Sequence, residues 1–281
     1  MKKIIYFLLI KILKILDYFN IFSNLKYNIY KLTLNYTLDL GLLQNLRIRS
    51  KKHKFVIHCI GDSHVTFFSG RNSTQKGWPM KSFDKYLFLK SYWFGAVLAY
   101  NLCSFKTRNK GREKLLYLLD HILPSGSKVL FCFGEIDCRA HLLKQAEIRG
   151  RPIQEITREC VDRYFSVIKE TKERGFDVLV FNVIPSGIID NANNLEFPFY
   201  GTKLERNRVS KYFNEYLKQK LNKFNITFID FFDKLVSENY KTKTSYYLDG
   251  VHLSQKAMPY FLNELFKNYP DLYRFIKKKS F

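Results

Sequence analysis

Two short segments far apart in the sequence carry residue types suited to nucleophilic catalysis. Residues 61–64 read Gly-Asp-Ser-His after an apolar stretch, and residues 249–252 read Asp-Gly-Val-His near the C-terminus. A serine hydroxyl is a weak nucleophile until a neighbouring base takes its proton. An Asp three residues before a His can fold back in a turn and hold one imidazole nitrogen, which leaves the other nitrogen for the serine. Together the segments supply a nucleophile, a base and an orienting carboxylate.

Each segment also has a purely structural interpretation. Asp and Ser after a strand often form a turn or a helix N-cap, because their side chains accept hydrogen bonds from free backbone N–H groups. Asp-Gly is likewise a common turn, so residues 249–252 could be only a loop before the last helix. The chemical interpretation gains weight when the segments are taken jointly, because one ends the first strand and the other precedes the last helix of one α/β pattern.

From residue 55 onward the chain alternates apolar strands with helices. We expect buried strands at residues 55–60, 128–133, 178–183 and 227–230, and helices at about 153–174 and 203–224. This alternation predicts a parallel sheet covered by helices on both faces, with ligands bound outside the carboxyl ends of the strands. Ser63 and Asp137 both follow predicted strands and so fall at those ends.

These motifs resemble the blocks of the SGNH/GDSL hydrolase family, over about residues 55–267. The first block of that family is a Gly-Asp-Ser at the end of the first strand, and its last block is Asp-x-x-His; both match here as they stand. The resemblance implies Ser63 as nucleophile, His252 as general base and Asp249 as its orienting partner. It also implies a three-layer α/β/α sandwich with a parallel, flavodoxin-like sheet.

A third block matches only in part. Residues 134–137 read Gly-Glu-Ile-Asp, where the family has Gly-x-Asn-Asp, so Ile136 replaces the oxyanion-hole asparagine. Removing one such donor commonly costs on the order of 100- to 1000-fold in turnover. The remaining oxyanion and substrate candidates are Gly95, which precedes a helix-like stretch at 97–102, together with Asp137 and Arg139. Arg139 could bind an anionic substrate, or it could form a structural ion pair with Asp137 or Asp62.

Composition restricts the partners. A formal charge of +22, from 47 Lys and Arg against 25 Asp and Glu, would attract nucleic acid, anionic lipid or acidic glycan. The sequence shows no helix-turn-helix, zinc-finger or RNP-type signature, so we expect no nucleic-acid partner. Cys138 and His141 have a ligand-like spacing without a second pair, so no metal is expected, and no cofactor is implied. Five cysteines, two of them in predicted strands, indicate a reduced compartment.

The N-terminal region differs from the rest. Residues 1–22 are apolar with lysines at helical spacing, too short and too often interrupted by charge for a membrane span of about 20 residues. No small-residue cleavage site follows, so we expect no cleaved signal peptide and a cytoplasmic protein. The segment suits the surface of an anionic membrane, or a helix docked on protein. A basic connector at 47–54 separates a helical extension, residues 1–54, from a catalytic domain, residues 55–281.

The sequence therefore favours a serine-dependent ester hydrolase acting on an O-acylated carbohydrate or a small ester, a substrate class that the family resemblance implies. The same triad could instead pass the acyl group to a sugar hydroxyl, as an O-acyltransferase of a cell-surface glycan does. Because Ile136 removes a family catalytic group, a non-catalytic glycan-binding module also stays open.

Overall fold

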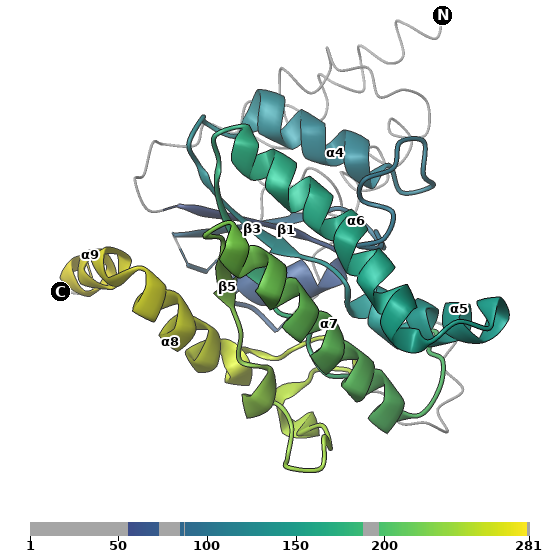
Figure 1. The fold of residues 1–281 in the computed structure, drawn as a ribbon. Helices are drawn as coiled ribbons and strands as arrows, with labels where there is room; N and C mark the ends of the chain where they lie inside the picture. The colour runs from purple at the N-terminus through teal and green to yellow at the C-terminus, as the bar shows by residue number, and fades with distance from the viewer. Residues whose placement is uncertain (1–55, 73–84, 87, 188–196, 280–281) are drawn as a thin grey trace, which may run out of the picture.

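The structure, a computed structural model, describes residues 56–72, 85–86, 88–187 and 197–279 (Figure 1). A five-stranded parallel sheet forms its centre, in the spatial order β2-β1-β3-β4-β5. The strands are β1 (Ile57–Gly61), β2 (Leu89–Trp93), β3 (Lys128–Cys132), β4 (Asp177–Phe181) and β5 (Thr227–Ile229). This order is that of flavodoxin-like sheets. It confirms the predicted fold class for the domain.

Helices cover both faces of the sheet, with α4, α6 and α7 on one face and α8 and α9 on the other (Figure 1). The α-helices are α4 (Gly111–Tyr117), α5 (Leu142–Arg149), α6 (Ile153–Glu173), α7 (Lys203–Lys223), α8 (Met258–Asn268) and α9 (Pro270–Lys279). A 3₁₀-helix, η1 (Ser63–Ser69), follows β1, and a short π-helical turn, η3 (Asp137–His141), follows β3.

The two faces of the sheet bury two separate hydrophobic clusters. Successive residues of β3 alternate between them: Phe131 packs toward α6 and α7, whereas Cys132 packs toward η1 and α8. On the second face, Phe181 of β4 contacts Phe68 of η1 and Phe261 of α8 through edge-on ring packing. Strands buried on both faces need apolar side chains throughout, which is why β1, β3 and β4 were recognisable from the sequence.

The predicted helices at 153–174 and 203–224 are confirmed as α6 and α7. Helix α7 begins at a capping box, in which Thr202 and Glu205 each accept a hydrogen bond from the other's backbone N–H. Strand β2 was not predicted, because a lysine and a serine interrupt its apolar pattern. The helix-like stretch at 97–102 forms turns rather than a helix.

The predicted extension of residues 1–54, with its membrane-surface segment 1–22, lies outside the described residues and stays a prediction. Within the described part of the chain, none of the helices combines the length and the apolar character that crossing a bilayer requires.

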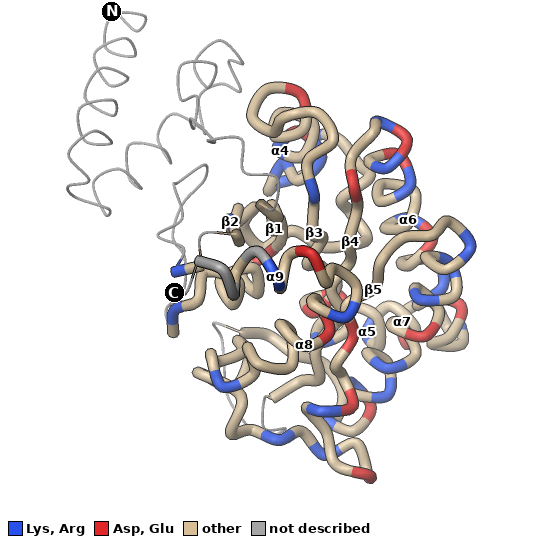
Figure 2. The backbone as a smooth tube through the Cα atoms, turned by 90° about the vertical axis from the view of Figure 1, so that its left-hand side faces the viewer, with Lys and Arg blue, Asp and Glu red and all other residues tan. Residues whose placement is uncertain are grey.

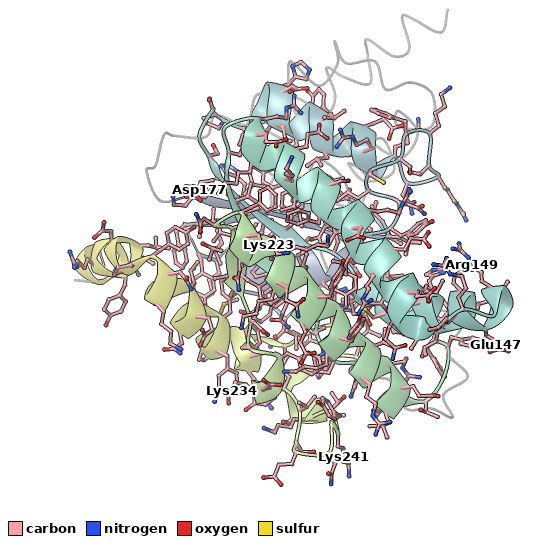
Figure 3. All side chains as sticks on the ribbon, in the orientation of Figure 1. Glu147, Arg149, Asp177, Lys223, Lys234 and Lys241 are labelled. Carbon is pink, nitrogen blue, oxygen red and sulfur yellow. The ribbon has the colours of Figure 1, made fainter. Side chains whose placement is uncertain are left out.

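Charged residues of both signs are spread along the outer helices (Figure 2). Several form surface ion pairs, including Lys220 with Asp162 and Lys211 with Asp233. Lys234 and Lys241 lie toward the lower edge of the domain in Figure 3, and Lys223 is exposed at the end of α7. The described basic residues thus show the distribution of a solvated surface rather than a single basic stripe.

The glycine that ends β1 provides a test of how tightly the nucleophile strand is packed. A Cβ at Gly61 would lie 2.3 Å from the carbonyl oxygen of Cys132, which is backbone and cannot move aside. We expect Gly61→Ala to lower the free energy of unfolding by about 3 kcal/mol, measured by urea denaturation. Gly126→Ala is the control, since its Cβ meets open space and only its left-handed backbone costs about 1 kcal/mol. Equal losses in the two variants would contradict this account.

Candidate active site

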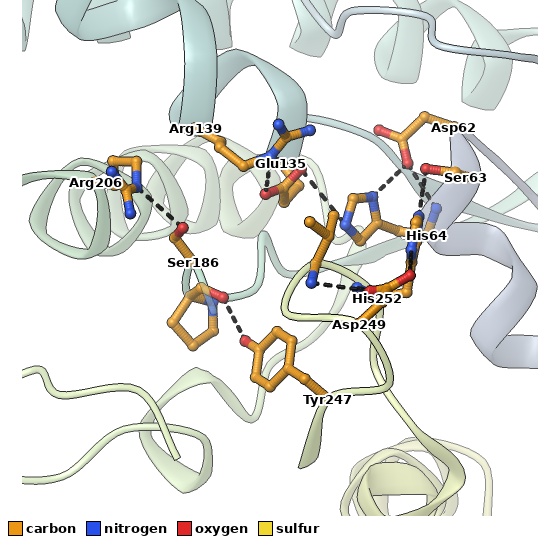
Figure 4. Close-up of polar contacts among 12 residues, drawn as sticks. Asp62, Ser63, His64, Glu135, Arg139, Ser186, Arg206, Tyr247, Asp249 and His252 are labelled. Carbon is orange, nitrogen blue, oxygen red and sulfur yellow. Dashed lines mark hydrogen bonds and ion pairs between the residues drawn. The ribbon is translucent and has the colours of Figure 1, made fainter. Parts of the chain in front are cut away.

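Ser63, His252 and Asp249 form a continuous chain of hydrogen bonds (Figure 4). The Oγ of Ser63 lies 2.8 Å from Nε2 of His252, and Nδ1 of His252 lies 2.7 Å from Oδ2 of Asp249. An ionised carboxylate can only accept, so Nδ1 carries the proton and Nε2 of the neutral ring is free to accept from the serine hydroxyl. The arrangement has the geometry that proton transfer from serine to histidine requires.

The turn at 249–252 orients the histidine through its own backbone. Oδ1 of Asp249 accepts hydrogen bonds from the backbone N–H groups of Val251 and His252, at 3.0 and 2.8 Å. Burial acts to raise the pKa of the Asp249 carboxyl, but the hydrogen bonds and charge of His252 outweigh it and hold the pKa well below its ordinary value. The carboxylate is therefore ionised at neutral pH, and the imidazole ring (3 % exposed) has a fixed orientation.

The turn that presents Ser63 is stabilised by Asp62, which caps η1. Its Oδ1 accepts from the backbone N–H of His64 at 2.9 Å and lies 2.8 Å from Nδ1 of the His64 ring. The ring centre of His64 lies 5.0 Å from that of His252. Asp62 and His64 are both buried, so a second, buried histidine–carboxylate pair lies next to the first.

Two further buried charges extend this pair. Nε2 of His64 lies 3.5 Å from Oε2 of Glu135, and Nε of Arg139 donates to Oε1 of Glu135 at 2.8 Å (Figure 4). The guanidinium of Arg139 also donates to the carbonyl of Pro198. We call Asp62, His64, Glu135 and Arg139 the buried charge network. It alternates in sign when His64 is protonated, and it links the turn after β1 to the segment after β3.

His64 has the environment of a protonated histidine. Burial by itself would lower its pKa, but the charges of Asp62 and Glu135 and the hydrogen bond to Asp62 outweigh this effect, so its pKa lies above the ordinary value. The Oδ2 of Asp62 and the Nε2 of His64 make no hydrogen bond within the described structure, and both residues line a small cavity with Glu135 and residues 182–184.

The structure places Gly95 at the same sheet edge as Ser63. Gly61 pairs with Trp93, and Ser63 and Gly95 each lie two residues beyond that pair. None of the described residues accepts a hydrogen bond from the backbone N–H of Ser63 or of Gly95. Ile136, half-buried at the start of the segment after β3, contributes no donor.

Asp137 and Arg139 are engaged within the protein. The carboxylate of Asp137 accepts from the backbone N–H groups of Ala99 and Tyr100, at 2.8 and 3.1 Å. Burial raises its pKa to about 6, against the lowering effect of these bonds. Arg139 is 5 % exposed and pairs with Glu135, rather than with Asp137 or Asp62 as the structural alternative had it. Asp137 binds the loop after β2 and Arg139 binds the loop that contains Pro198, and both side chains are buried.

Sequence reasoning missed two residues near the triad. His64 and Glu135 stand within the motifs that identified Ser63 and Asp137, but their pairing depends on the tertiary contact between two loops. Phe197, from the loop between β4 and α7, packs its ring edge-on against His252, with centroids 5.5 Å apart. No cluster of three or more potential metal ligands occurs in the parts of the chain that the structure describes.

Residues 128–265 match the model of the GDSL-like lipase/acylhydrolase family. This range includes the third block and the Asp-x-x-His block, while the Ser63 turn lies before it. No curated protein matches the sequence. The predicted resemblance is confirmed by this match: over residues 128–265 the chain is similar to the GDSL-like lipase/acylhydrolase family.

Solved structures show the same fold. A proposed platelet activating factor from Streptococcus pneumonia superposes with a TM-score of 0.50 at 16% identity, covering 85% of this chain and 96% of that one. A proposed acylhydrolase from Bacteroides fragilis NCTC 9343 gives a TM-score of 0.50 at 15% identity, covering 83% of this chain and 96% of its own. At such identities the likeness concerns the fold alone.

The buried charge network implies that the free energy of unfolding depends on pH through His64. A histidine whose pKa is raised by folding stabilises the folded state below its unfolded pKa of about 6.5, and this contribution is lost as the pH rises through the folded value. We expect His64→Gln to reduce the free energy of unfolding by about 2 kcal/mol at pH 6, and by less at pH 9. Urea denaturation at the two pH values measures the difference, with the exposed His121→Gln as the control. A deficit that stayed constant with pH would show that His64 is not protonated in the fold.

Proposed function

We propose that this protein is a serine-dependent ester hydrolase that removes acyl groups from an O-acylated carbohydrate or another small ester. The observation that carries the proposal is the unbroken hydrogen-bond chain from Ser63 through His252 to Asp249. The acylhydrolase description of the matching family supports the same reaction class. The carbohydrate part of the proposal has weaker support, which is the family resemblance and the basic composition of the chain.

In this mechanism the Oγ of Ser63 attacks the ester carbonyl carbon while Nε2 of His252 takes the hydroxyl proton. The tetrahedral intermediate then collapses, His252 returns the proton to the departing alcohol oxygen, and the acyl group remains on Ser63. Water attacks the acyl-enzyme, giving a proton to Nε2, and the second collapse releases the carboxylic acid and restores the serine. Asp249 stays ionised throughout and stabilises the imidazolium that forms in each half-reaction.

We assign the oxyanion hole to the backbone N–H groups of Ser63 and Gly95. None of the described residues accepts a hydrogen bond from either N–H, and both residues follow the carboxyl ends of paired strands, at the sheet edge that carries Ser63. A hole without the family's asparagine has one donor fewer, so we expect modest turnover with unactivated esters. The carboxylate of Asp137 accepts hydrogen bonds from the backbone at residues 99–100 and so restrains the loop that continues from Gly95.

Acyl transfer to a sugar is the second candidate. The Phe197 ring against His252 favours it, because an apolar wall beside the base restricts where water can approach the acyl-enzyme. Assays in which an acceptor sugar is added to the ester distinguish the two reactions: a transferase yields an acylated sugar at the expense of free acid. A ligand-binding module without catalysis would bind glycans equally well with and without the Ser63 hydroxyl.

We place the enzyme in the cytoplasm, with residues 1–22 directing it to an anionic membrane surface. This part of the proposal rests on the sequence alone. Sedimentation with anionic vesicles, compared between the full chain and a chain that begins after residue 22, tests it. Equal sedimentation of the two would contradict it.

The triad is tested by single substitutions. We expect Ser63→Ala and His252→Ala each to lower kcat for short-chain p-nitrophenyl esters and an acetylated sugar by about 1000-fold or more, and Asp249→Asn by a comparable factor. Ser166→Ala, which removes an exposed hydroxyl on α6, should leave kcat unchanged. Circular dichroism confirms that each variant is folded. Full activity in Ser63→Ala would exclude this mechanism.

A further inference from the structure

One lysine contacts the peptide group that supplies a donor to the proposed oxyanion hole. This lysine has no role in the mechanism described above. Lys114, on α4, donates a hydrogen bond of 2.6 Å from Nζ to the carbonyl oxygen of Phe94. The Phe94 carbonyl and the Gly95 N–H belong to the same peptide group. Nζ also lies 3.9 Å from where a Cβ of Gly95 would stand, so the ammonium is next to the residue that provides one of the two hole donors.

The Phe94–Gly95 peptide is fixed relative to the nucleophile strand. The backbone N–H of Phe94 donates to the carbonyl of Gly61 at 2.8 Å, which ties it to the end of β1 just before Ser63. Its side chain is fully buried and packs against Phe133. Gly95 has a φ of +89°, in the region that only glycine adopts freely, and this sets the orientation of the peptide. The lysine therefore acts on a rigid group.

The direction of the peptide dipole decides what this contact does. In a trans peptide the C=O and N–H bonds point in opposite directions, so a cation on the carbonyl of Phe94 lies opposite to the side toward which Gly95 donates. A hydrogen bond to the carbonyl strengthens the donor at the other end of the same amide, and a full positive charge does so more than a neutral donor. Donors aimed at a developing oxyanion gain most from such polarisation.

We propose that Lys114 is a positioning residue for the oxyanion hole: its ammonium holds and polarises the Phe94–Gly95 peptide and so compensates in part for the donor that Ile136 lacks. This inference rests on the proposed esterase activity at Ser63. It adds a residue that the family motifs do not contain. Lys114 touches no reacting atom and acts only through the Gly95 N–H.

The surroundings of Lys114 give the proposal a distinctive pH dependence. Burial, and next the positive charge of Lys110, lower the pKa of the Lys114 ammonium to about 8, while Glu113 opposes the shift. The neutral group that accepts its hydrogen bond is the Phe94 carbonyl, and the Oδ1 of Asn109 lies 4.0 Å from where a Cβ on Gly95 would stand. Activity should therefore fall as the pH rises through about 8, when the ammonium loses its charge.

The contribution of Lys114 to the free energy of unfolding should not fall with rising pH as the activity does. A lysine whose folded pKa is about 8, below the ordinary value of 10.5, leaves the unfolded chain holding more protons between these values. The contribution of Lys114 to the free energy of unfolding therefore increases with pH in that interval. A fall in kcat without a fall in melting temperature separates the proposed effect from alkaline unfolding.

The test compares Lys114→Met and Lys114→Arg with the wild type on short-chain p-nitrophenyl esters between pH 6 and 10, read at a wavelength where the product absorbs equally at every pH. We expect Lys114→Met to lower kcat on the order of 10-fold at pH 7 with little change in KM. The fall in kcat near pH 8, which we call the alkaline limb of the pH profile, should be absent in this variant. Lys114→Arg should recover most of kcat, and its alkaline limb should move beyond the range, because guanidinium stays charged.

Two further variants serve as controls. Lys110→Met removes a charge that disfavours the Lys114 ammonium, so kcat at pH 7 should be retained and the alkaline limb should move to higher pH. Lys223 is exposed at the end of α7, so Lys223→Met should change neither kcat at pH 7 nor the pH at which activity falls. If folded Lys114→Met keeps the wild-type kcat and an alkaline limb near pH 8, the inference is wrong. A wild type without any activity that depends on Ser63 would instead refute the proposed function.

Discussion

The hydrogen bond between Ser63 and His252 is the contact on which the site depends, and it joins residues 189 positions apart. The serine is held from the side of β1, by the Asp62 cap and by the close approach of Gly61 to the Cys132 carbonyl. The histidine is held by the 249–252 turn, which is closed by a bridge between Tyr247 and Leu253. A second close backbone approach, at Gly187 and Gly250, brings this turn against the loop after β4. Small shifts in either support would lengthen the bond that activates the nucleophile.

The buried charge network connects the residues that flank the nucleophile to the segment after β3. Four ionisable groups out of water would be costly if they were unpaired, and their alternation in sign keeps the cost down. The arrangement also has an electrostatic consequence for catalysis. Two carboxylates near a developing oxyanion would disfavour it, whereas His64 in its protonated form and Arg139 balance them. The network thus lets the protein connect the loops after β1 and β3 without leaving a net negative charge beside Ser63.

In the proposed mechanism, the departure at Ile136 changes how the oxyanion hole is built. In the family pattern a side-chain amide supplies a donor directly, but here the proposed donors are two backbone N–H groups. Backbone donors are fixed by the fold and cost little reorganisation, yet their strength depends on what bonds to the opposite end of each peptide. Lys114 occupies that position for Gly95, and Asp137 restrains the loop that continues from it. In this proposal, several residues of the surrounding loops and of α4 together replace the stabilisation that one asparagine side chain would give the oxyanion.

The sequence by itself determined the local features of this protein. The apolar runs of β1, β3 and β4 specify strands buried on both faces, and the Asp-x-x-His spacing specifies a turn in which a carboxylate can reach its own histidine. Only the tertiary structure decided the long-range pairings. Strand β2 forms because an edge position tolerates its polar residues, and His64 meets Glu135 because the loops after the neighbouring strands β1 and β3 lie side by side. The contact between Lys114 and Phe94 depends on how α4 packs against the loop after β2, and no local pattern of residues encodes that distance.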